Sequence, residues 1–287
     1  MDLIKAIIMG IVQGVAEFLP ISSSGHLAIF KQLLNIETDT GIMFDIMLHF
    51  GTLVAIFIVF FKDIRQLIIG GFSIIGRFFY NIYAFIFRHG KGYKKIIANE
   101  YDRFVMLIIV STIPTGIIGV LIKDYVEKAS ENLLIVGICL IITAVLLKIA
   151  DKTREGKITA ADATYKKAGL IGIAQGIATM PGISRSGTTI TACLRCGFTK
   201  DFAVRYSFIM SIPAVLCAVV LDIPDLIESG SDTSLLFNYT IGTIVSGIVG
   251  YICIVFMIKL IKKKNFSFFT IYCAAVGVIA IAGHFIR

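Results

Sequence analysis

Long apolar stretches alternate with short polar ones along most of this chain. Six of the stretches are about 20 residues long, the length that an α-helix needs to cross the hydrocarbon core of a bilayer. With 57% hydrophobic and 16% charged residues, the composition is that of a membrane protein. We therefore predict an all-α polytopic membrane protein with six transmembrane helices, over 43–61, 104–122, 132–150, 203–221, 237–261 and 267–286.

Two further apolar segments are interrupted before they reach spanning length. Residues 2–18 are followed by a proline and a run of Ser and Gly before apolar residues resume over 26–35. Residues 168–180 are broken by Pro181-Gly182 in the same way. Irregular backbone at membrane depth is tolerated where protein or a cavity surrounds it. Each segment therefore predicts a re-entrant helix–loop–helix hairpin that returns to the side from which it entered.

The charged residues predict the orientation in the membrane. Lys and Arg gather in segments 62–103, 148–167 and 262–266, whereas 36–42 and 222–235 contain acidic residues and no Lys or Arg. Basic loops stay in the cytoplasm under the positive-inside rule. This asymmetry also accounts for the net charge of +8, so we expect a membrane partner and no nucleic acid.

The same orientation makes the two hairpins enter from opposite sides. Three expected spans separate them, and an odd number of crossings inverts the second hairpin. The sequence therefore predicts one membrane domain, 1–287, made of inverted-topology halves of about 1–150 and 160–287. Segment 64–95 has two interpretations, an amphipathic helix on the cytoplasmic surface or an ordinary charged loop.

The interrupted segments are copies of each other. Positions 10–26 match positions 172–188 at nine of seventeen places, with an offset of 162 residues. The chemical groups differ between the copies. Glu17 and His26 of the first copy correspond to Thr179 and Thr188 of the second, and Ser23 corresponds to Arg185. One copy carries acid/base groups and the other a cation, which indicates one composite site built from both halves.

The residue types at the two interruptions suit a phosphate or diphosphate. Ser is a good helix N-cap, and the helix that follows presents free N–H groups to an anion. Arg185 adds a fork of donors, and an Arg at membrane depth needs a partner or a function. We expect substrate to bind to Gln13, Ser22, Ser24, Gly25, Ser184, Ser186, Gly187 and Thr188.

The remaining polar groups are the candidates for chemistry. Glu17 could hold a divalent cation or act as a base. His26 could be a nucleophile or an acid/base group, and Ser23 offers a hydroxyl for attack. Asp45, His49 and Arg205 are weaker candidates, because Arg205 suits a cytoplasmic anchor and the other two could simply lie near the mouth of a cavity.

Structural interpretations compete with each of these. Glu17 and Arg185 could be a packing ion pair, the Ser/Gly loops could serve close helix contact, and His26 could be an ordinary buried histidine. The cost of polar groups at membrane depth accumulates, which favours a functional site over all of these together. The Cys193-x-x-Cys196 spacing has no second Cys/His pair nearby, so a metal site there is not expected.

At these residues the chain resembles a known family. Gln13-Gly-Val-Ala-Glu17-Phe-Leu-Pro-Ile-Ser-Ser-Ser-Gly-His26 is similar to the Glu-containing, Ser-rich motif of bacterial undecaprenyl-diphosphate phosphatases. Pro181-Gly-Ile-Ser-Arg-Ser-Gly-Thr188 is similar to their second motif, and the resemblance continues through 45–52 and 205–213. Some members carry Glu where this chain has Gln13, so Glu17 should supply the required carboxylate here.

The resemblance implies hydrolysis of undecaprenyl diphosphate to undecaprenyl phosphate and inorganic phosphate, which recycles the carrier lipid for cell-wall synthesis and confers bacitracin resistance. It implies a divalent cation, Mg²⁺ or Ca²⁺, with Glu17 as its ligand. It also implies a multi-pass protein of the bacterial cell membrane whose site opens to the outer face. The nucleophile stays open between Ser23, His26 and water, and a homodimer stays open as well.

Two other functional classes compete with hydrolysis. Inverted repeats with broken helices are common in transporters, so a transporter or flippase of a lipid phosphate is the alternative. A membrane scaffold would have no use for Glu17, His26 and Arg185 at membrane depth.

Overall fold

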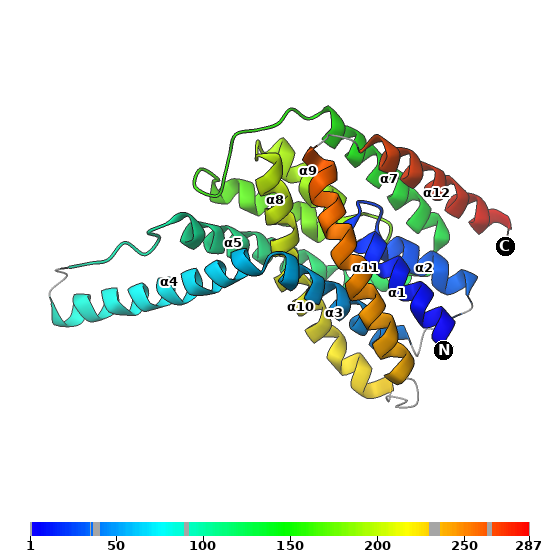
Figure 1. The fold of residues 1–287 in the computed structure, drawn as a ribbon, viewed down its shortest axis with the longest axis horizontal. Helices are drawn as coiled ribbons and strands as arrows, with labels where there is room; N and C mark the ends of the chain where they lie inside the picture. Colours follow the sequence, from blue (N-terminus) through cyan, green and yellow to red (C-terminus); the bar gives the residue numbers. More distant parts are fainter. Residues whose placement is uncertain are drawn as a thin grey trace.

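A computed structural model describes residues 2–34, 36, 41–88, 92–229, 236–262 and 266–286. Within these residues the chain forms helices and no β-strand, apart from one isolated bridge between Ile158 and Phe198. The all-α prediction is therefore confirmed (Figure 1). The helices are α1 (Leu3–Phe18), α2 (Ser23–Leu33), α3 (Gly41–Val59), α4 (Phe61–Phe87), α5 (Glu100–Leu121), α6 (Lys123–Ser130), α7 (Leu133–Lys152), α8 (Tyr165–Ile177), α9 (Arg185–Arg195), α10 (Lys200–Ser229), α11 (Leu236–Lys262) and α12 (Ser267–Ile286).

Among the described residues, six helices are long and apolar enough to cross a membrane. Five of them, α5, α7, α10, α11 and α12, correspond to expected spans. The sixth is α4, which lies in the segment that the charge pattern assigned to the cytoplasm. α4 is apolar enough because Phe, Ile and Leu recur along its 27 residues. The expected span 43–61 corresponds to α3, whose apolar segment Met43–Val59 is shorter than the other six.

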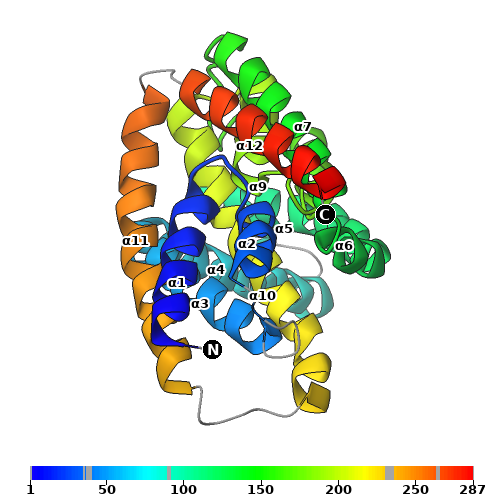
Figure 2. The ribbon, with the colours of Figure 1, turned by 90° about the vertical axis from the view of Figure 1, so that its right-hand side faces the viewer.

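Both interrupted segments are broken helices. α1 ends at Phe18 before Pro20, and α2 begins at Ser23 and runs back beside α1 (Figure 2). In the second copy, α8 ends at Ile177 and α9 begins at Arg185. Pro20 has no amide hydrogen and restricts the residue before it, which explains why the first helix stops there.

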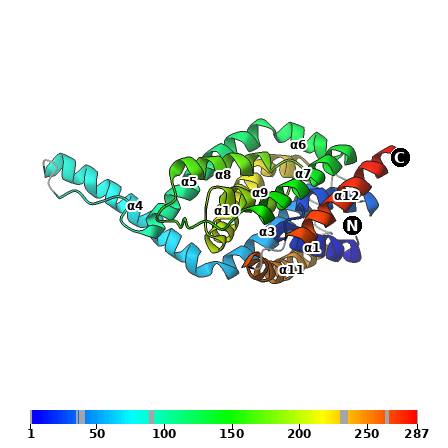
Figure 3. The same cartoon turned by 90° about the horizontal axis from the view of Figure 1, so that it is seen from above.

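Helices from the two halves of the chain pack on one another. α1 of the first half packs along α11 of the second, and α8 of the second half packs along α5 of the first. α7 and α12 form a third pair, visible side by side in Figures 2 and 3. The four hairpin helices are thereby held between helices of both halves.

Small residues allow the backbones of these pairs to approach closely. A Cβ atom on Gly14 of α1 would lie 2.7 Å from the carbonyl oxygen of Ser246 on α11. Gly137 of α7 and Gly277 of α12 face each other, since a Cβ on either would lie 2.8 Å from the other's carbonyl oxygen. In lipid, helices associate through such close packing because no hydrophobic effect drives them together.

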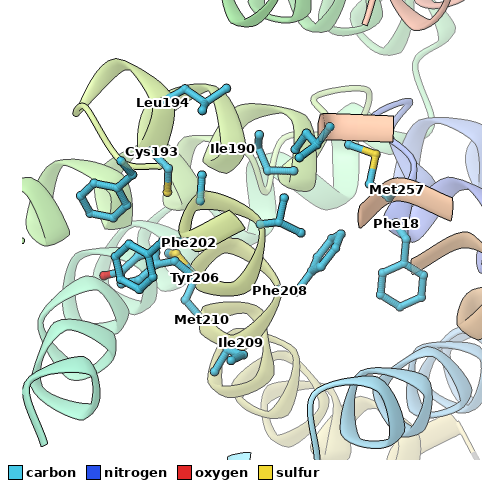
Figure 4. Packing of buried hydrophobic residues seen from close by; sticks show 14 of the residues in the cluster. Phe18, Ile190, Cys193, Leu194, Phe202, Tyr206, Phe208, Ile209, Met210 and Met257 are labelled. Carbon is cyan, nitrogen blue, oxygen red and sulfur yellow. The ribbon is translucent and has the colours of Figure 1, made fainter. Parts of the chain in front are cut away.

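An aromatic core positions the end of α1. The ring of Phe18 meets the ring of Phe208 on α10 edge-on, at 5.6 Å between centroids (Figure 4). Tyr206 is fully buried nearby, and its hydroxyl donates to the Leu107 carbonyl of α5 at 2.9 Å. Glu17 is the residue before Phe18, so this packing fixes where the carboxylate can reach.

We expect Gly277→Ala to destabilise the protein by about 1–3 kcal/mol, because the added methyl group overpacks the α7–α12 contact. Thermal unfolding in detergent measures the effect. Gly283→Ala in the same helix is the matched control, since no atom lies within 4 Å of its new Cβ. Equal stability of the two variants would contradict the importance of this contact.

Candidate active site

The two helix breaks share one local design. The Ser22 side chain accepts a hydrogen bond from the Gly25 amide at 3.2 Å, which caps α2. The Ser184 side chain caps α9 in the same way, accepting from the Gly187 amide at 3.1 Å. Ser22 has a φ of 73°, a left-handed conformation that is strained for a residue other than glycine. The N-cap function expected of Ser is thus present at both helix starts.

The two breaks also touch each other. A Cβ on Gly25 would lie 2.9 Å from the Gly182 Cα atom, and a Cβ on Gly187 would lie 3.2 Å from the Pro20 Cβ atom. At the offset of 162 residues, Pro20 corresponds to Gly182 and Gly25 corresponds to Gly187. The two contacts are therefore equivalent to each other with the copies exchanged. Ser186 adds a hydrogen bond from its hydroxyl to the Leu19 carbonyl at 3.4 Å.

The carboxylate of Glu17 is the centre of the polar network. Its Oε1 atom accepts a hydrogen bond from Nη2 of Arg185 at 2.5 Å. Its Oε2 atom accepts from Oγ of Ser23 at 2.6 Å and from Nε2 of Gln13 at 3.1 Å. The Glu17 side chain is only 5% exposed. The structure therefore brings three candidates from the first copy together with Arg185 from the second.

His26 is held by hydrogen bonds through both ring nitrogens. Nδ1 lies 2.8 Å from the Ser22 carbonyl oxygen, and Nε2 lies 2.8 Å from the Tyr272 hydroxyl on α12. The two rings are nearly parallel, with centroids 5.6 Å apart. A carbonyl oxygen can only accept, so Nδ1 carries hydrogen, and neutral His26 accepts at Nε2 from the tyrosine. His26 thus fastens the first break to α12.

His49 is placed differently. Its Nδ1 atom donates to the Asp45 carbonyl one helical turn earlier, at 2.8 Å. Its Nε2 atom makes no hydrogen bond within the described residues and lies 4.0 Å from Oε2 of Glu17. Asp45 forms an ion pair with Lys31 of α2. These contacts place Asp45 and His49 at the edge of the Glu17 network.

A cavity of about 480 Å³ lies on this side of Glu17. Ser24, Lys31, Asp45 and His49 contribute its polar lining, and Glu131 before α7 borders it. His49 lines the cavity and its Nε2 atom lies 4.0 Å from Oε2 of Glu17, so the cavity is adjacent to the Glu17 network. The volume suits a diphosphate head group, and ligand sites are commonly of this size.

The side chains of Arg205 and Thr188 make no described hydrogen bond to this network. Arg205 forms an ion pair with Asp63 at the start of α4, and no described contact joins it to Glu17 or Arg185. Thr188 is buried, and its hydroxyl has no hydrogen-bond partner among the described residues. The anchor interpretation of Arg205 therefore fits its surroundings better than the ligand interpretation.

Three residues that support the site could not be found from the sequence motifs alone. Tyr272 holds His26, and Lys31 holds Asp45. Thr143 of α7 donates to the Gly182 carbonyl and accepts from the Ser184 amide, both at 2.9 Å, so it supports the second break. The only signal in the sequence is that Thr143 and Tyr272 are hydroxyl groups within apolar spans.

The donor set suits a cation that is shared with a phosphate ligand. Within the described residues, no group of three or more His, Cys, Asp or Glu side chains could hold a metal ion. Glu17 does have a second oxygen beside it, since Oε1 of Gln13 is buried and unpartnered among the described residues. Mg²⁺ is often held by one or two carboxylates plus substrate phosphates. The residues present therefore fit a cation that arrives with a diphosphate.

Comparison with known proteins agrees over nearly the whole chain. The family model described as bacitracin resistance protein BacA matches residues 6–279. A protein of Methanosphaera stadtmanae named undecaprenyl-diphosphatase is 44% identical over 281 residues, covering 98% of both chains. A protein of the same name from Treponema denticola is 42% identical over 283 residues, covering 97% of this chain and 96% of its own. The chain therefore belongs to the BacA family of bacitracin resistance proteins.

Proposed function

We propose that this protein hydrolyses undecaprenyl diphosphate to undecaprenyl phosphate and inorganic phosphate, and so recycles a carrier lipid and confers bacitracin resistance. The relatives named undecaprenyl-diphosphatase support this substrate. The observation that carries the proposal is the contact of Glu17 with both Ser23 and Arg185. It joins a base, a hydroxyl and a cation at one point beside an open cavity.

The base and the nucleophile follow from the Glu17 hydrogen bonds. Ser23 donates to Oε2 of Glu17 at 2.6 Å, so the carboxylate can take the hydroxyl proton as Oγ attacks the distal phosphorus. The bond from that phosphorus to the bridging oxygen then breaks, and undecaprenyl phosphate leaves. Water hydrolyses the phosphoserine, and Ser23 regains its proton. If water attacked directly instead, it would need the same base.

Arg185 and the capped helix starts stabilise the developing charge. Only Nη2 of Arg185 has a described partner, which leaves the other guanidinium donors for phosphate oxygens. The first turns of α2 and α9 contribute backbone N–H groups at the positions where an anion is stabilised. A divalent cation held by Glu17 and Gln13 would neutralise further charge on the diphosphate. Ser22, Ser24, Ser184, Ser186 and Gly187 belong to the caps and first turns of these two helices.

His26 acts as a positioning residue in this mechanism. Its two nitrogens are engaged by the Ser22 carbonyl and the Tyr272 hydroxyl, so neither is free to attack phosphorus. Its hydrogen bond to Ser22 supports the strained residue that precedes Ser23. The imidazole therefore keeps the nucleophile in place.

The site opens to the outer face in this proposal, and the hairpins are re-entrant. The cavity borders Ser130 and Glu131, in the α6–α7 connection that the charge pattern predicts outside. The equivalent contacts of Pro20 with Gly187 and of Gly25 with Gly182 support an inverted repeat. The prenyl chain would lie in the bilayer against apolar helices while the diphosphate enters the cavity from the side.

The first test is phosphate release from undecaprenyl diphosphate by purified protein in detergent. We expect Glu17→Gln and Arg185→Ala each to lower the rate by roughly a hundredfold or more, the usual contribution of such groups. Chelation of divalent cations should also stop release. Glu100→Gln and Arg195→Ala are matched controls at exposed positions. If the folded protein released no phosphate but moved the lipid between leaflets, the transporter alternative would replace this proposal.

A second test separates the nucleophile from its support. Ser23→Ala should abolish both release and a phosphoserine trapped by rapid acid quenching. Tyr272→Phe removes one interhelical hydrogen bond, so it should lower the free energy of unfolding by about 1 kcal/mol. It should reduce the rate of phosphate release less than tenfold. Tyr251→Phe, at an exposed tyrosine, is the control. Loss of all activity in a folded Tyr272→Phe protein would instead give His26 a direct part in the chemistry.

A further inference from the structure

Helix α4 leaves the bundle as a long arm. Figures 1 and 3 show it extending away from the other helices, with the chain returning beside it to the start of α5. The return is close, because a Cβ on Gly70 of α4 would lie 3.4 Å from Oδ1 of Asp102 on α5. The diphosphate site does not use any residue of this arm.

One face of α4 is apolar and uncovered along its length. From Ile68 to Ile86 its residues recur every three or four positions, which places them on one side of the helix, and Phe61 lies on the same side two turns before Ile68, with Arg65 between them. They are 40% to 72% exposed, far more than packed core side chains. This apolar face consists of Phe61, Ile68, Phe72, Ile75, Phe79, Ile82 and Ile86.

The opposite face is polar and is covered by the returning chain. Arg77 donates to the Ile96 carbonyl at 2.7 Å and to Oδ2 of Asp102 at 2.8 Å. Asn81 donates to the Lys94 carbonyl and accepts from the Lys94 amide, both at 2.8 Å. The arm is therefore two-sided, with an apolar face on the helix and a polar side built from backbone and charged groups.

This construction argues against α4 as a transmembrane helix, although its length would allow it. Residues 92–99 are non-helical and almost all exposed, and they run beside the second half of α4. If α4 crossed the bilayer, this irregular backbone would lie in hydrocarbon, where unpaired N–H and C=O groups are not tolerated. The chain also returns to the level of Gly70, so the arm contributes no net crossing.

The charges of the arm suit an anionic surface. Two of its acids are already paired, Asp63 with Arg205 and Asp102 with Arg77. Among the described residues of the arm, Lys62, Arg65, Arg88, Lys94 and Lys95 are exposed cations. Basic residues near a membrane that contains anionic lipid contribute about 1 kcal/mol each to the attraction.

The apolar face continues the surface of a helix expected to face lipid. Phe57 and Ile58 of α3 line one apolar groove together with Phe61 of α4. We propose that α4 lies in the plane of the bilayer interface, on the side of the basic loops, with its apolar face among the acyl chains and its basic residues at anionic head groups. An in-plane helix of this kind has one apolar face and a polar face rich in Lys and Arg.

The absence of tryptophan from the chain makes a direct test available, because any introduced Trp is the only one. Single Trp substitutions at Phe61, Phe72, Phe79 and Ile86 would report depth in vesicles of phosphatidylcholine and phosphatidylglycerol. Lipids brominated at shallow or deep carbons quench Trp fluorescence at the matching depth. We expect stronger quenching by the shallow label at all four positions, and little quenching of Gln66→Trp on the polar face.

Three outcomes would overturn the proposal. Quenching that moves to the deep label in the middle of α4 would mean that the helix spans the bilayer. Emission typical of water at all four positions would place the arm outside the membrane. A Trp that is shielded from water, more so at a higher protein-to-lipid ratio, and that neither brominated lipid quenches would mean that a second copy of this chain covers the face.

A separate variant tests how much the basic residues of the arm contribute to membrane binding. We expect shallow quenching of Phe72→Trp to weaken when phosphatidylglycerol is left out, and to weaken likewise when Lys94 and Lys95 are both replaced by Gln. The same replacement at Lys5 and Lys128, which lie outside the arm, is the control. Quenching that is insensitive to both changes would remove the anionic lipid from the proposal.

Discussion

The ion pair between Glu17 and Arg185 connects two helix ends that are 168 residues apart in the chain. Both groups are largely buried, so each depends on the other for its charge to be stabilised. Removing one partner of a buried pair leaves an unpaired charge, which typically costs about 3–5 kcal/mol. The contact of Phe18 with Phe208 of α10 and the capping of α9 by Ser184 are the features that bring these side chains within reach. The composite site is therefore also the connection between the two breaks.

Close helix packing makes this connection feasible in lipid. The breaks meet through Gly25, Gly182 and Gly187, and the helix pairs meet through Gly14 and Gly277, where larger side chains would separate the backbones. Close approach lets hydroxyl and amide groups satisfy one another across the interface. Thr143 does this for the second break and Tyr272 for the first. Side chains from other helices thus satisfy polar groups at both breaks.

The two copies of the sequence repeat share their caps and contacts but carry different polar side chains. Equivalent serines cap both helices, and equivalent contacts bring both breaks together. Only the side chains that carry chemistry differ, with Glu17 and Ser23 on one copy and Arg185 on the other. Two cations in identical positions would repel each other, and two carboxylates would repel a phosphate. An asymmetric pair avoids both problems while equivalent serines still cap both helices.

The sequence by itself determined the helical class, five of the spans, both helix breaks and the pairing of candidates across the repeat. These properties are local or compositional: apolar length, a proline, an N-cap and a charge. Tertiary structure alone decided the contacts of each histidine, because Tyr272 reaches His26 from α12, whereas Nε2 of His49 lies 4.0 Å from the Glu17 carboxylate and makes no hydrogen bond among the described residues. It also showed that α4 is a helix with its polar face covered by residues 94–99. The sequence is equally compatible with a charged loop over this segment. Contacts between distant segments depend on how helices pack, and no local pattern records which side chain will face which.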